Sequence, residues 1–287
     1  FVSSANPLNQ GPDVGQAVKQ FSAIDFKVVF DHFMTDTAAQ ADIILPAASV
    51  FEQEDIFCTV MFSPVLTYSH QALAPPAGLM TEFDFYIALA DRMGIDLGFK
   101  TTDVYLRAAV SPLLKKLDIS YGNLKTGLIT LPGSEVAWEE KKFETRSGSI
   151  EIYSEEAKTD GHSPLPVFIP PTEPEEVHLL RLLTCHAEES MHSQGFAFVA
   201  QRPGIYVNEN TAAAIGAEHD SDVVVSSAVG RLTARLEIDN SVCDQAAFMY
   251  QGFWQKSGNV NLLTEVKISD MGQQAAFYDT FCTIVKK

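Results

Sequence analysis

The fold of this chain is decided by Phe26-Lys27-Val28-Val29-Phe30 and Ile43-Ile44-Leu45, two short runs of apolar, β-prone residues. Runs of this length and composition predict strands, of which the first is expected to be buried and to stop at Asp31 and the second to be closed by Pro46. A short helix is predicted between them at residues 37–41, and a longer one precedes them at residues 12–21. Strands that alternate with helices in this order indicate a parallel sheet, so we expect an α/β domain.

The middle of the chain is less regular. Residues 83–93 and 104–117 have helical patterns, and Gly94 is placed to end the first of these helices. A hairpin is expected around Ser147-Gly148. An extended connector is then marked by five prolines, Pro164, Pro166, Pro170, Pro171 and Pro174. We therefore predict an α/β domain at residues 1–100, an irregular extension and linker at 101–176, and a further domain at 177–287.

The last part of the chain changes character and becomes rich in strands. Strands are predicted at residues 177–180, 204–207, 222–225 and 232–238, with turns at Gly230 and at Asp239-Asn240. A single short helix is expected at residues 209–215, ending at Gly216. Many short strands around one small helix indicate a closed β-barrel.

Composition excludes several classes of protein. The chain has 287 residues, of which 46% are hydrophobic, so it can bury a sizeable core. Its net charge of −17 argues against nucleic acid as a partner, because phosphate binding requires clustered lysine and arginine. No run of about 18 apolar residues is present, so no membrane span is expected. The four cysteines have no spacing typical of zinc or iron–sulfur ligands: Cys58, Cys185, Cys243 and Cys282.

The N-terminal residues Phe1-Val2-Ser3-Ser4 lack the basic and long apolar regions of a signal peptide. They have the pattern of a buried strand that runs into a turn at Asn6-Pro7. We therefore expect the sequence to be a fragment of a longer protein.

Five groups of short segments carry a resemblance, although each group alone has little specificity. They are Ser4-Ala5-Asn6-Pro7 with Pro12-Asp13; residues 29–38, 41–47 and Glu52; residues 143–151; residues 183–186 and 192–194; and residues 259–264 with 268–276. In this order, and across nearly all of the chain, they resemble the molybdopterin oxidoreductase superfamily. That group contains dimethyl-sulfoxide reductase, formate dehydrogenase and periplasmic nitrate reductase.

The resemblance implies a specific architecture and cofactor. It covers the late part of the third domain and the whole fourth domain of such enzymes, which implies an α/β Rossmann-like parallel-sheet domain followed by a double-psi β-barrel. The implied cofactor is molybdopterin guanine dinucleotide with molybdenum or tungsten. An iron–sulfur cluster and the metal-ligating residue are implied only for the missing N-terminal half, so the metal has no ligand in this segment.

Asn6 and Asp31 are the candidate cofactor-binding residues of the α/β domain, because each follows a predicted strand. Dinucleotides bind outside the carboxyl ends of parallel strands, where a carboxylate can accept hydrogen bonds from a guanine edge or a ribose. The alternative is structural: Asn6 would shape a turn and Asp31 would cap the following helix. The family resemblance favours the binding role, whereas Asp42 and Glu52 have the pattern of structural residues.

The barrel supplies a second set of candidates. Residues 184–194 follow its first strand, and the resembling family uses this loop to contact pterin and phosphate groups. The candidates are Thr184, His186, His192, Ser193 and Gln194. Many relatives have Gly and Arg where this chain has Cys185 and His186, a difference that changes the charge of the contact.

The C-terminal segment completes the predicted site. Asn261 lies in the family's Asn-x-Leu-Thr turn, whose amide offers a donor and an acceptor to a pterin edge. Gln273, Gln274 and Tyr278 are predicted to close over the pterin, and the alternative for them is ordinary loop polarity. Trp254 and Phe253 could pack at the same mouth, although such residues more often belong to a core.

No complete catalytic set is found in the sequence, so catalytic residues are predicted to be none and the segment alone to be inactive. The leading hypothesis is the C-terminal fragment of a molybdopterin-dependent oxidoreductase, whose redox chemistry at molybdenum or tungsten needs the missing half. Its expected partners are that N-terminal half, an electron-transfer subunit and a small-molecule substrate. The alternatives are a non-catalytic scaffold or assembly subunit with the same fold, and a non-redox, hydratase-type enzyme. The sequence makes no prediction of localisation.

Overall fold

The computed structural model describes residues 1–58, 64–133, 136–171, 173–174, 176, 178–188, 190–194, 202–269 and 272–287. The chain forms two compact units, one made of residues 1–45 and 171–287 and the other of residues 46–170. These units group residues 46–100 with the irregular extension, unlike the predicted domains. The predicted boundary at residue 177 lies outside the described residues. The three-domain division stays a prediction.

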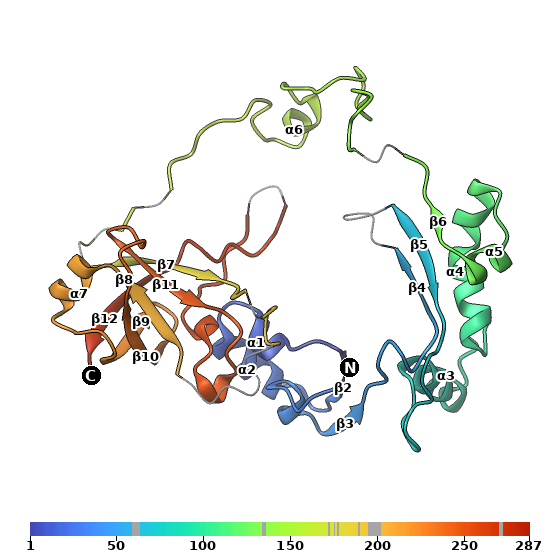
Figure 1. Ribbon diagram of the computed structural model, residues 1–287, viewed down its shortest axis with the longest axis horizontal. Helices are drawn as coiled ribbons and strands as arrows, with labels where there is room; N and C mark the ends of the chain where they lie inside the picture. Colours follow the sequence, from blue (N-terminus) through green and yellow to red (C-terminus); the bar gives the residue numbers. More distant parts are fainter. Residues whose placement is uncertain are drawn as a thin grey trace. The chain divides into compact units, whose positions relative to one another are not determined.

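The first unit begins with a small sheet whose strands lie in the order β1-β2-β3 (Figure 1). The strands are β1 (Val2–Ser3), β2 (Val28–Asp31) and β3 (Ile43–Pro46). Strand β1 pairs in parallel with β2, with Val2 opposite Val29, which confirms the parallel pairing predicted from sequence. All three apolar residues of β2 are buried, as a strand packed on both faces requires.

Short helices connect these strands: α1 (Pro7–Gln10), α2 (Val14–Ser22) and the 3₁₀ helix η1 (Ala38–Gln40). Helix α2 starts where Asp13 accepts a 3.0 Å hydrogen bond from the main-chain nitrogen of Gln16. Asp42 accepts a 2.7 Å bond from the main-chain nitrogen of Lys27, so its structural interpretation is confirmed. The helices thereby bring the chain back to the same edge of the sheet after each strand.

The rest of this unit is a closed barrel of six strands in the order β10-β8-β11-β7-β12-β9, drawn from yellow to red in Figure 1. The strands are β7 (Leu180–Cys185), β8 (Gly204–Val207), β9 (Asp222–Ser227), β10 (Arg231–Ile238), β11 (Ala246–Tyr250) and β12 (Phe281–Lys286). Helix α7 (Glu209–Ile215) ends at Gly216, whose φ is 71°. The predicted barrel is therefore confirmed, although sequence patterns missed β11 and β12.

Period-two alternation explains the barrel core. On β9 the buried residues are Val223 and Val225, and on β10 they are Leu232, Ala234 and Leu236. Alternate side chains of a strand point to the same face, so these residues fill the barrel interior. Two further 3₁₀ helices, η3 (Gln255–Ser257) and η4 (Val260–Leu262), lie between β11 and β12.

The second unit combines the antiparallel sheet β4-β5-β6 with four helices. Its elements are β4 (Asp55–Cys58), β5 (Val65–Ser69), β6 (Ile129–Thr130), α3 (Glu82–Met93), α4 (Thr102–Leu117), α5 (Tyr121–Thr126) and α6 (Glu155–Thr159). Helix α3 ends at Gly94 in the left-handed conformation, as predicted. Glu52 accepts a 2.8 Å bond from the Ser49 nitrogen, consistent with its structural interpretation.

The hairpin expected around Ser147-Gly148 is wrong. Gly148 makes a turn by donating a 3.1 Å hydrogen bond to the Thr145 carbonyl, and neither side of the turn continues as a strand. The turn is closed by side chains instead: the Thr145 hydroxyl donates to the Ser149 carbonyl at 2.7 Å. Within the described part of the chain, no helix is long and apolar enough to cross a membrane.

Candidate functional site

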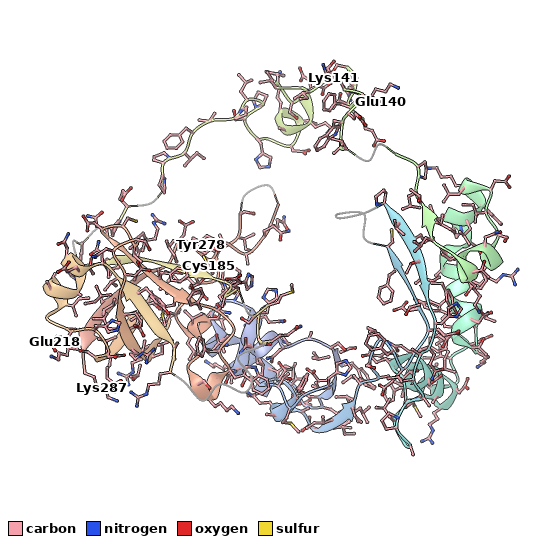
Figure 2. The ribbon with its side chains drawn as sticks, in the orientation of Figure 1. Glu140, Lys141, Cys185, Glu218, Tyr278 and Lys287 are labelled. Carbon is pink, nitrogen blue, oxygen red and sulfur yellow. The ribbon has the colours of Figure 1, made fainter. Side chains whose placement is uncertain are left out.

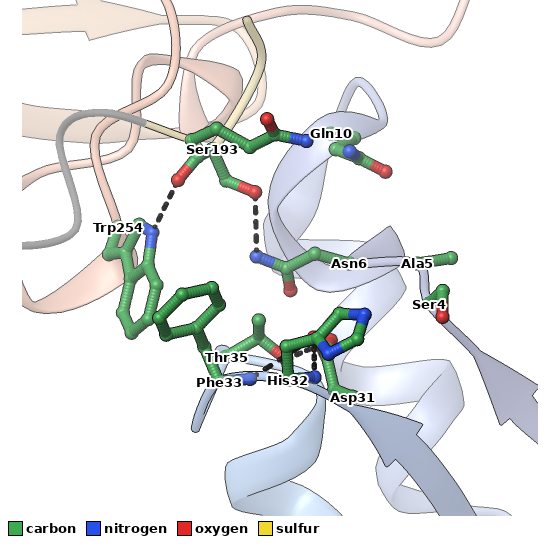
Figure 3. Close-up of a pocket in the computed structure, with 11 residues that line it drawn as sticks. Ser4, Ala5, Asn6, Gln10, Asp31, His32, Phe33, Thr35, Ser193 and Trp254 are labelled. Atoms are coloured by element: carbon green, nitrogen blue, oxygen red, sulfur yellow. Dashed lines mark hydrogen bonds between the residues drawn. The ribbon is translucent and has the colours of Figure 1, made fainter. Parts of the chain in front are cut away.

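A cavity of about 510 Å³ lies at the carboxyl ends of β1 and β2 (Figure 3). The sheet side contributes residues that directly follow the two strands, and the barrel side contributes the loop after β7 and the segment after β11. Its lining residues are Ser4, Ala5, Asn6, Gln10, Asp31, His32, Phe33, Thr35, Ser193, Gln194 and Trp254. The structure therefore brings together four residues predicted from sequence: Asn6, Asp31, Ser193 and Gln194.

Asn6 joins both walls of the cavity. Its side-chain nitrogen donates a 3.2 Å hydrogen bond to the Ser193 hydroxyl, and its side-chain oxygen accepts bonds from the hydroxyl and main-chain nitrogen of Thr37 at 2.8 and 3.2 Å. The residue is 3% exposed. The second amide hydrogen of Asn6 has no acceptor among the described residues, so it remains available to a molecule in the cavity.

Asp31 is half-buried at the end of β2 and shapes the turn that follows. One carboxylate oxygen accepts a 2.8 Å bond from the His32 nitrogen, and the other accepts a 3.1 Å bond from the Thr35 hydroxyl. Asp31 therefore has a structural role, which is to stabilise this turn and not to cap the following helix. A carboxylate has about four acceptor positions, so Asp31 can also accept hydrogen bonds from a ligand.

The loop after β7 is held at Ser193, which is 8% exposed. The Ser193 carbonyl accepts a 2.9 Å bond from the indole nitrogen of Trp254, while its hydroxyl accepts from Asn6. Both contacts are drawn in Figure 3. A loop residue between exposed neighbours is therefore fixed from two sides of the cavity.

Left-handed backbone conformations occur beside the cavity on both walls. The φ of Ser4 is 45° and that of His192 is 50°. Neither residue is glycine, so each conformation costs on the order of 1 kcal/mol and requires surrounding contacts to maintain it. Such conformations concentrate at binding sites, in agreement with the position of these two residues.

The two predicted histidines meet each other. Nε2 of His186 lies 3.2 Å from Nδ1 of His192, and the rings are perpendicular with centroids 4.6 Å apart. One of these two nitrogens must carry a hydrogen and the other a lone pair. Burial, followed by the nearby charge of His186, lowers the pKa of His192 below its usual 6.5.

Tyr278 meets the start of the same loop, as the labelled side chains in Figure 2 show. Its hydroxyl lies 3.9 Å from the Cys185 sulfur. Burial is the main cause that raises the pKa of Tyr278, and the hydrogen bond with Cys185 adds to it. Neither residue lines the cavity. The surface formed by the loop after β7 therefore continues outside the cavity.

Thr184 and Asn261 are not among the residues that line the cavity, and the direct cofactor contacts expected for them stay predictions. Thr184 is fully buried, and its hydroxyl and carbonyl both accept from the Gln251 side chain, at 3.3 and 2.9 Å. Asn261 is 2% exposed and donates a 2.8 Å bond to the Asn9 carbonyl. Thr184 is thus bonded within the barrel, whereas Asn261 joins the segment after β11 to α1.

Gln273 and Gln274 belong to a turn stabilised by local bonds. Gln273 has a φ of 48°, and the main-chain nitrogen of Gln274 donates a 3.0 Å hydrogen bond to the Ser269 hydroxyl. Neither lines the cavity. The contact predicted between this segment and a pterin stays a prediction.

Sequence reasoning missed several lining residues. Gln10, Phe33 and Thr35 were not singled out, and Trp254 was more readily assigned to a core. Phe33 is 58% exposed although it is large and apolar. Phe33 and Thr35 could have been identified from their position, because they follow Asp31 at the end of a strand, where ligands of α/β sheets bind.

The cavity has the size and the groups that a nucleoside requires. Its volume falls in the range of roughly 300–1,000 Å³ typical of ligand pockets. It offers a carboxylate acceptor at Asp31, amide donors at Asn6 and Gln194, and aromatic surfaces at Phe33 and Trp254. None of the described residues that line it is lysine or arginine, so this lining suits a base and sugar better than phosphate groups.

Comparisons with known proteins match both the N-terminal part of the chain and the barrel. Residues 1–92 match the family model described as Molybdopterin oxidoreductase, and residues 180–281 match the model described as Molydopterin dinucleotide binding domain. The chain is 28% identical to "Probable oxidoreductase YyaE" of Bacillus subtilis, covering 100% of this chain and 44% of that protein. It is 27% identical to "Probable oxidoreductase YoaE" of the same organism, covering 97% and 42%.

A solved structure shows the same fold. Acetylene hydratase from Pelobacter acetylenicus superposes with a TM-score of 0.78 at 21% identity, covering 99% of this chain and 43% of that chain. The chain spans less than half the length of the curated relatives it matches. The two family models match the two parts that form the cavity. The chain therefore belongs to the molybdopterin oxidoreductase family.

Proposed function

We propose that this chain binds molybdopterin guanine dinucleotide and that the cavity beside Asn6 and Asp31 receives its guanosine end. The observation that carries the proposal is the cavity itself. It joins the carboxyl ends of β1 and β2 to the barrel loop at Ser193 and Gln194. Dinucleotides bind at this edge of parallel sheets. The family model that matches the barrel residues describes a dinucleotide-binding domain.

Guanine fits the polar groups of the cavity better than adenine does. Its ring N–H and exocyclic amino group are adjacent donors, which a single carboxylate can accept together. Asp31 supplies that carboxylate, and the remaining hydrogen of Asn6 can be donated to a base or ribose oxygen. The exposed ring of Phe33 offers a face on which a base can stack.

The pterin and phosphate groups lie, in this proposal, against the loop surface beyond the cavity. One N–H of the His186–His192 pair is used in the bond between the rings, and the accepting ring keeps a second N–H that can be donated to an anion. Gln273, Gln274 and Tyr278 would close over the pterin. Thr184 and Asn261 would support the site indirectly, because their hydrogen bonds hold β7 and the sheet in place.

The cofactor supplies the redox chemistry when it is bound with molybdenum or tungsten, and this chain supplies position and electrostatics. The proposed whole protein is an oxidoreductase whose other half holds the metal ligand and any iron–sulfur cluster. An electron-transfer subunit and a small-molecule substrate are its proposed partners. The chain spans less than half the length of these relatives, which supports the proposal that another part of the protein holds the metal ligand. We also propose that the parallel-sheet domain is Rossmann-like and that the barrel is of the double-psi type.

Two alternatives remain distinguishable. A scaffold subunit with this fold would bind no nucleotide, and its isolated form would contain neither metal nor guanine. A hydratase-type enzyme would contain the cofactor but would hydrate its substrate without transferring electrons. Metal analysis, guanine release by acid hydrolysis and a dye-reduction assay on the longest natural form of the protein separate these three outcomes.

The experiment on this chain is calorimetric titration with guanosine diphosphate and adenosine diphosphate. We expect guanosine diphosphate to bind more tightly, and Asp31→Asn to raise its Kd about tenfold by removing a charged acceptor while keeping the bond to Thr35. Asp25→Asn, at an exposed position before β2, is the matched control. Equal binding of both nucleotides, or no effect of Asp31→Asn, would contradict the guanosine assignment.

A further inference from the structure

Trp254 does not belong to the buried hydrophobic core of the barrel. It follows β11, lines the cavity and is only partly buried. Its indole N–H donates a 2.9 Å bond to the Ser193 carbonyl, across 61 positions of sequence. The bond reaches the main chain of a loop, so its effect is on where that loop lies.

Besides its own turn bonds and the contact between His192 and His186, the described part of the loop is tied to other elements at Ser193. Met191, His192 and Gln194 are exposed, whereas Ser193 between them is buried. His192 has the left-handed φ of 50°, which costs free energy unless neighbouring contacts offset it. Among the described residues, Asn6 and Trp254 donate hydrogen bonds across the cavity to Ser193.

Trp254 is itself anchored to the sheet through its chain neighbours. The Phe253 carbonyl accepts a 2.9 Å bond from the Asn9 side chain. The Gln255 side chain donates a 2.6 Å bond to the Leu8 carbonyl, and its main-chain nitrogen donates a 3.1 Å bond to Asp36. The indole therefore extends from a segment whose position is set by α1 and the turn after β2.

We propose that Trp254 is a positioning residue of the nucleotide cavity: its indole N–H holds the Ser193 main chain so that residues 190–194 form the barrel wall against which a guanine nucleotide binds. The inference rests on the proposed function for the identity of the ligand. The hydrogen bond from Trp254 to Ser193 fixes the loop before ligand arrives, and preorganisation of this kind increases affinity without adding a contact.

The test uses Trp254→Phe, which keeps an aromatic ring and removes the N–H. In the ligand-free 287-residue chain, amide hydrogen exchange of residues 190–194 is expected to become severalfold faster, with little change in the melting temperature. Trp138→Phe is the control, because Trp138 is the second of the two tryptophans and lies in the other compact unit. Unchanged exchange in Trp254→Phe would overturn the proposal, whether or not any nucleotide binds.

Nucleotide binding gives the second readout. In the Trp138→Phe background Trp254 is the sole tryptophan, so guanosine diphosphate in the cavity should change its fluorescence directly. Calorimetry should then show a Kd about fivefold higher for Trp254→Phe, the value expected from one neutral hydrogen bond. Normal affinity in Trp254→Phe would overturn the positioning role and leave the proposed function intact. Failure of the unaltered chain to bind guanosine diphosphate would instead contradict the proposed function, and hydrogen exchange would still decide the positioning role.

Discussion

The side-chain nitrogen of Asn6 lies 3.2 Å from the Ser193 hydroxyl, a hydrogen bond between residues 187 positions apart. It links the end of the first strand to a loop of the barrel and is buried. The opposite end of the same amide accepts two bonds from Thr37. One side chain thus fixes the distance between the two walls of the cavity.

Replacing Asn6 by alanine should destabilise the first compact unit. The substitution leaves the buried main-chain N–H of Thr37 without its acceptor, which costs about 1–3 kcal/mol. Urea denaturation followed by circular dichroism measures the free energy of unfolding. Gln20→Ala, at an exposed position of α2, is the control and should change that free energy little. An Asn6→Ala protein as stable as this control would contradict the assigned bonds.

Asn261→Ala should lower stability without lowering nucleotide affinity. Its amide donates to the Asn9 carbonyl, and Asn259 donates to the same oxygen at 3.0 Å. We expect a loss of about 1 kcal/mol, because one donor remains. The Kd for guanosine diphosphate, measured where the variant is fully folded, should be unchanged. A large rise in Kd at full folding would restore the direct binding role that the sequence predicted for Asn261.

Gly230→Ala should be strongly destabilising although its φ is ordinary. A Cβ at this position would lie 2.2 Å from the Leu262 carbonyl oxygen, which belongs to η4. Because that contact is with backbone, the turn or η4 must move, at a cost of about 1–3 kcal/mol.

Gly122→Ala is the matched comparison for that substitution. Its Cβ would meet only the Ser120 hydroxyl at 3.7 Å, and the site lies in helix α5. Alanine is the better helix former, so this variant should be slightly more stable than the original protein. Thermal melts of both variants check the pair, and a Gly230→Ala protein that melts no lower than Gly122→Ala would rule out the predicted clash.

The His186–His192 pair predicts a specific pH dependence. Since the pKa of His192 is lowered below 6.5 in the folded protein, the unfolded chain binds the proton at a higher pH. The stabilising contribution of neutral His192 is therefore present above about pH 6.5 and is lost as pH falls through the folded pKa. His192 is exposed, so screening by solvent should keep the effect to a few tenths of a kcal/mol.

Nuclear magnetic resonance of the imidazole protons measures this pKa directly. His186→Gln should raise the pKa of His192 partway toward 6.5, because it removes the neighbouring charge but leaves burial in place. His162→Gln, in the other compact unit, should leave the His192 titration unchanged. A His192 pKa above 6.5 in the original protein would contradict the predicted pH dependence.

The sequence by itself determined the local elements and the place where a ligand would bind. Val28-Val29-Phe30 is too apolar to remain outside a sheet, and the alternation in Leu232–Ile238 admits only one buried face. Asn6 and Asp31 were identifiable because each lies near the carboxyl end of a strand, and such positions converge at one sheet edge.

Tertiary structure alone decided which polar residues face that edge and which are consumed by packing. Asn261 and Asn6 are both buried asparagines in family motifs, yet one bonds to Asn9 and the other borders the cavity. Trp254 reaches Ser193 because β11 pairs in parallel with β7, which places the segments after these two strands side by side. The hydrogen-bond capacity of a side chain is set by its type, but its partners are set by contacts between distant parts of the chain, which local patterns do not encode.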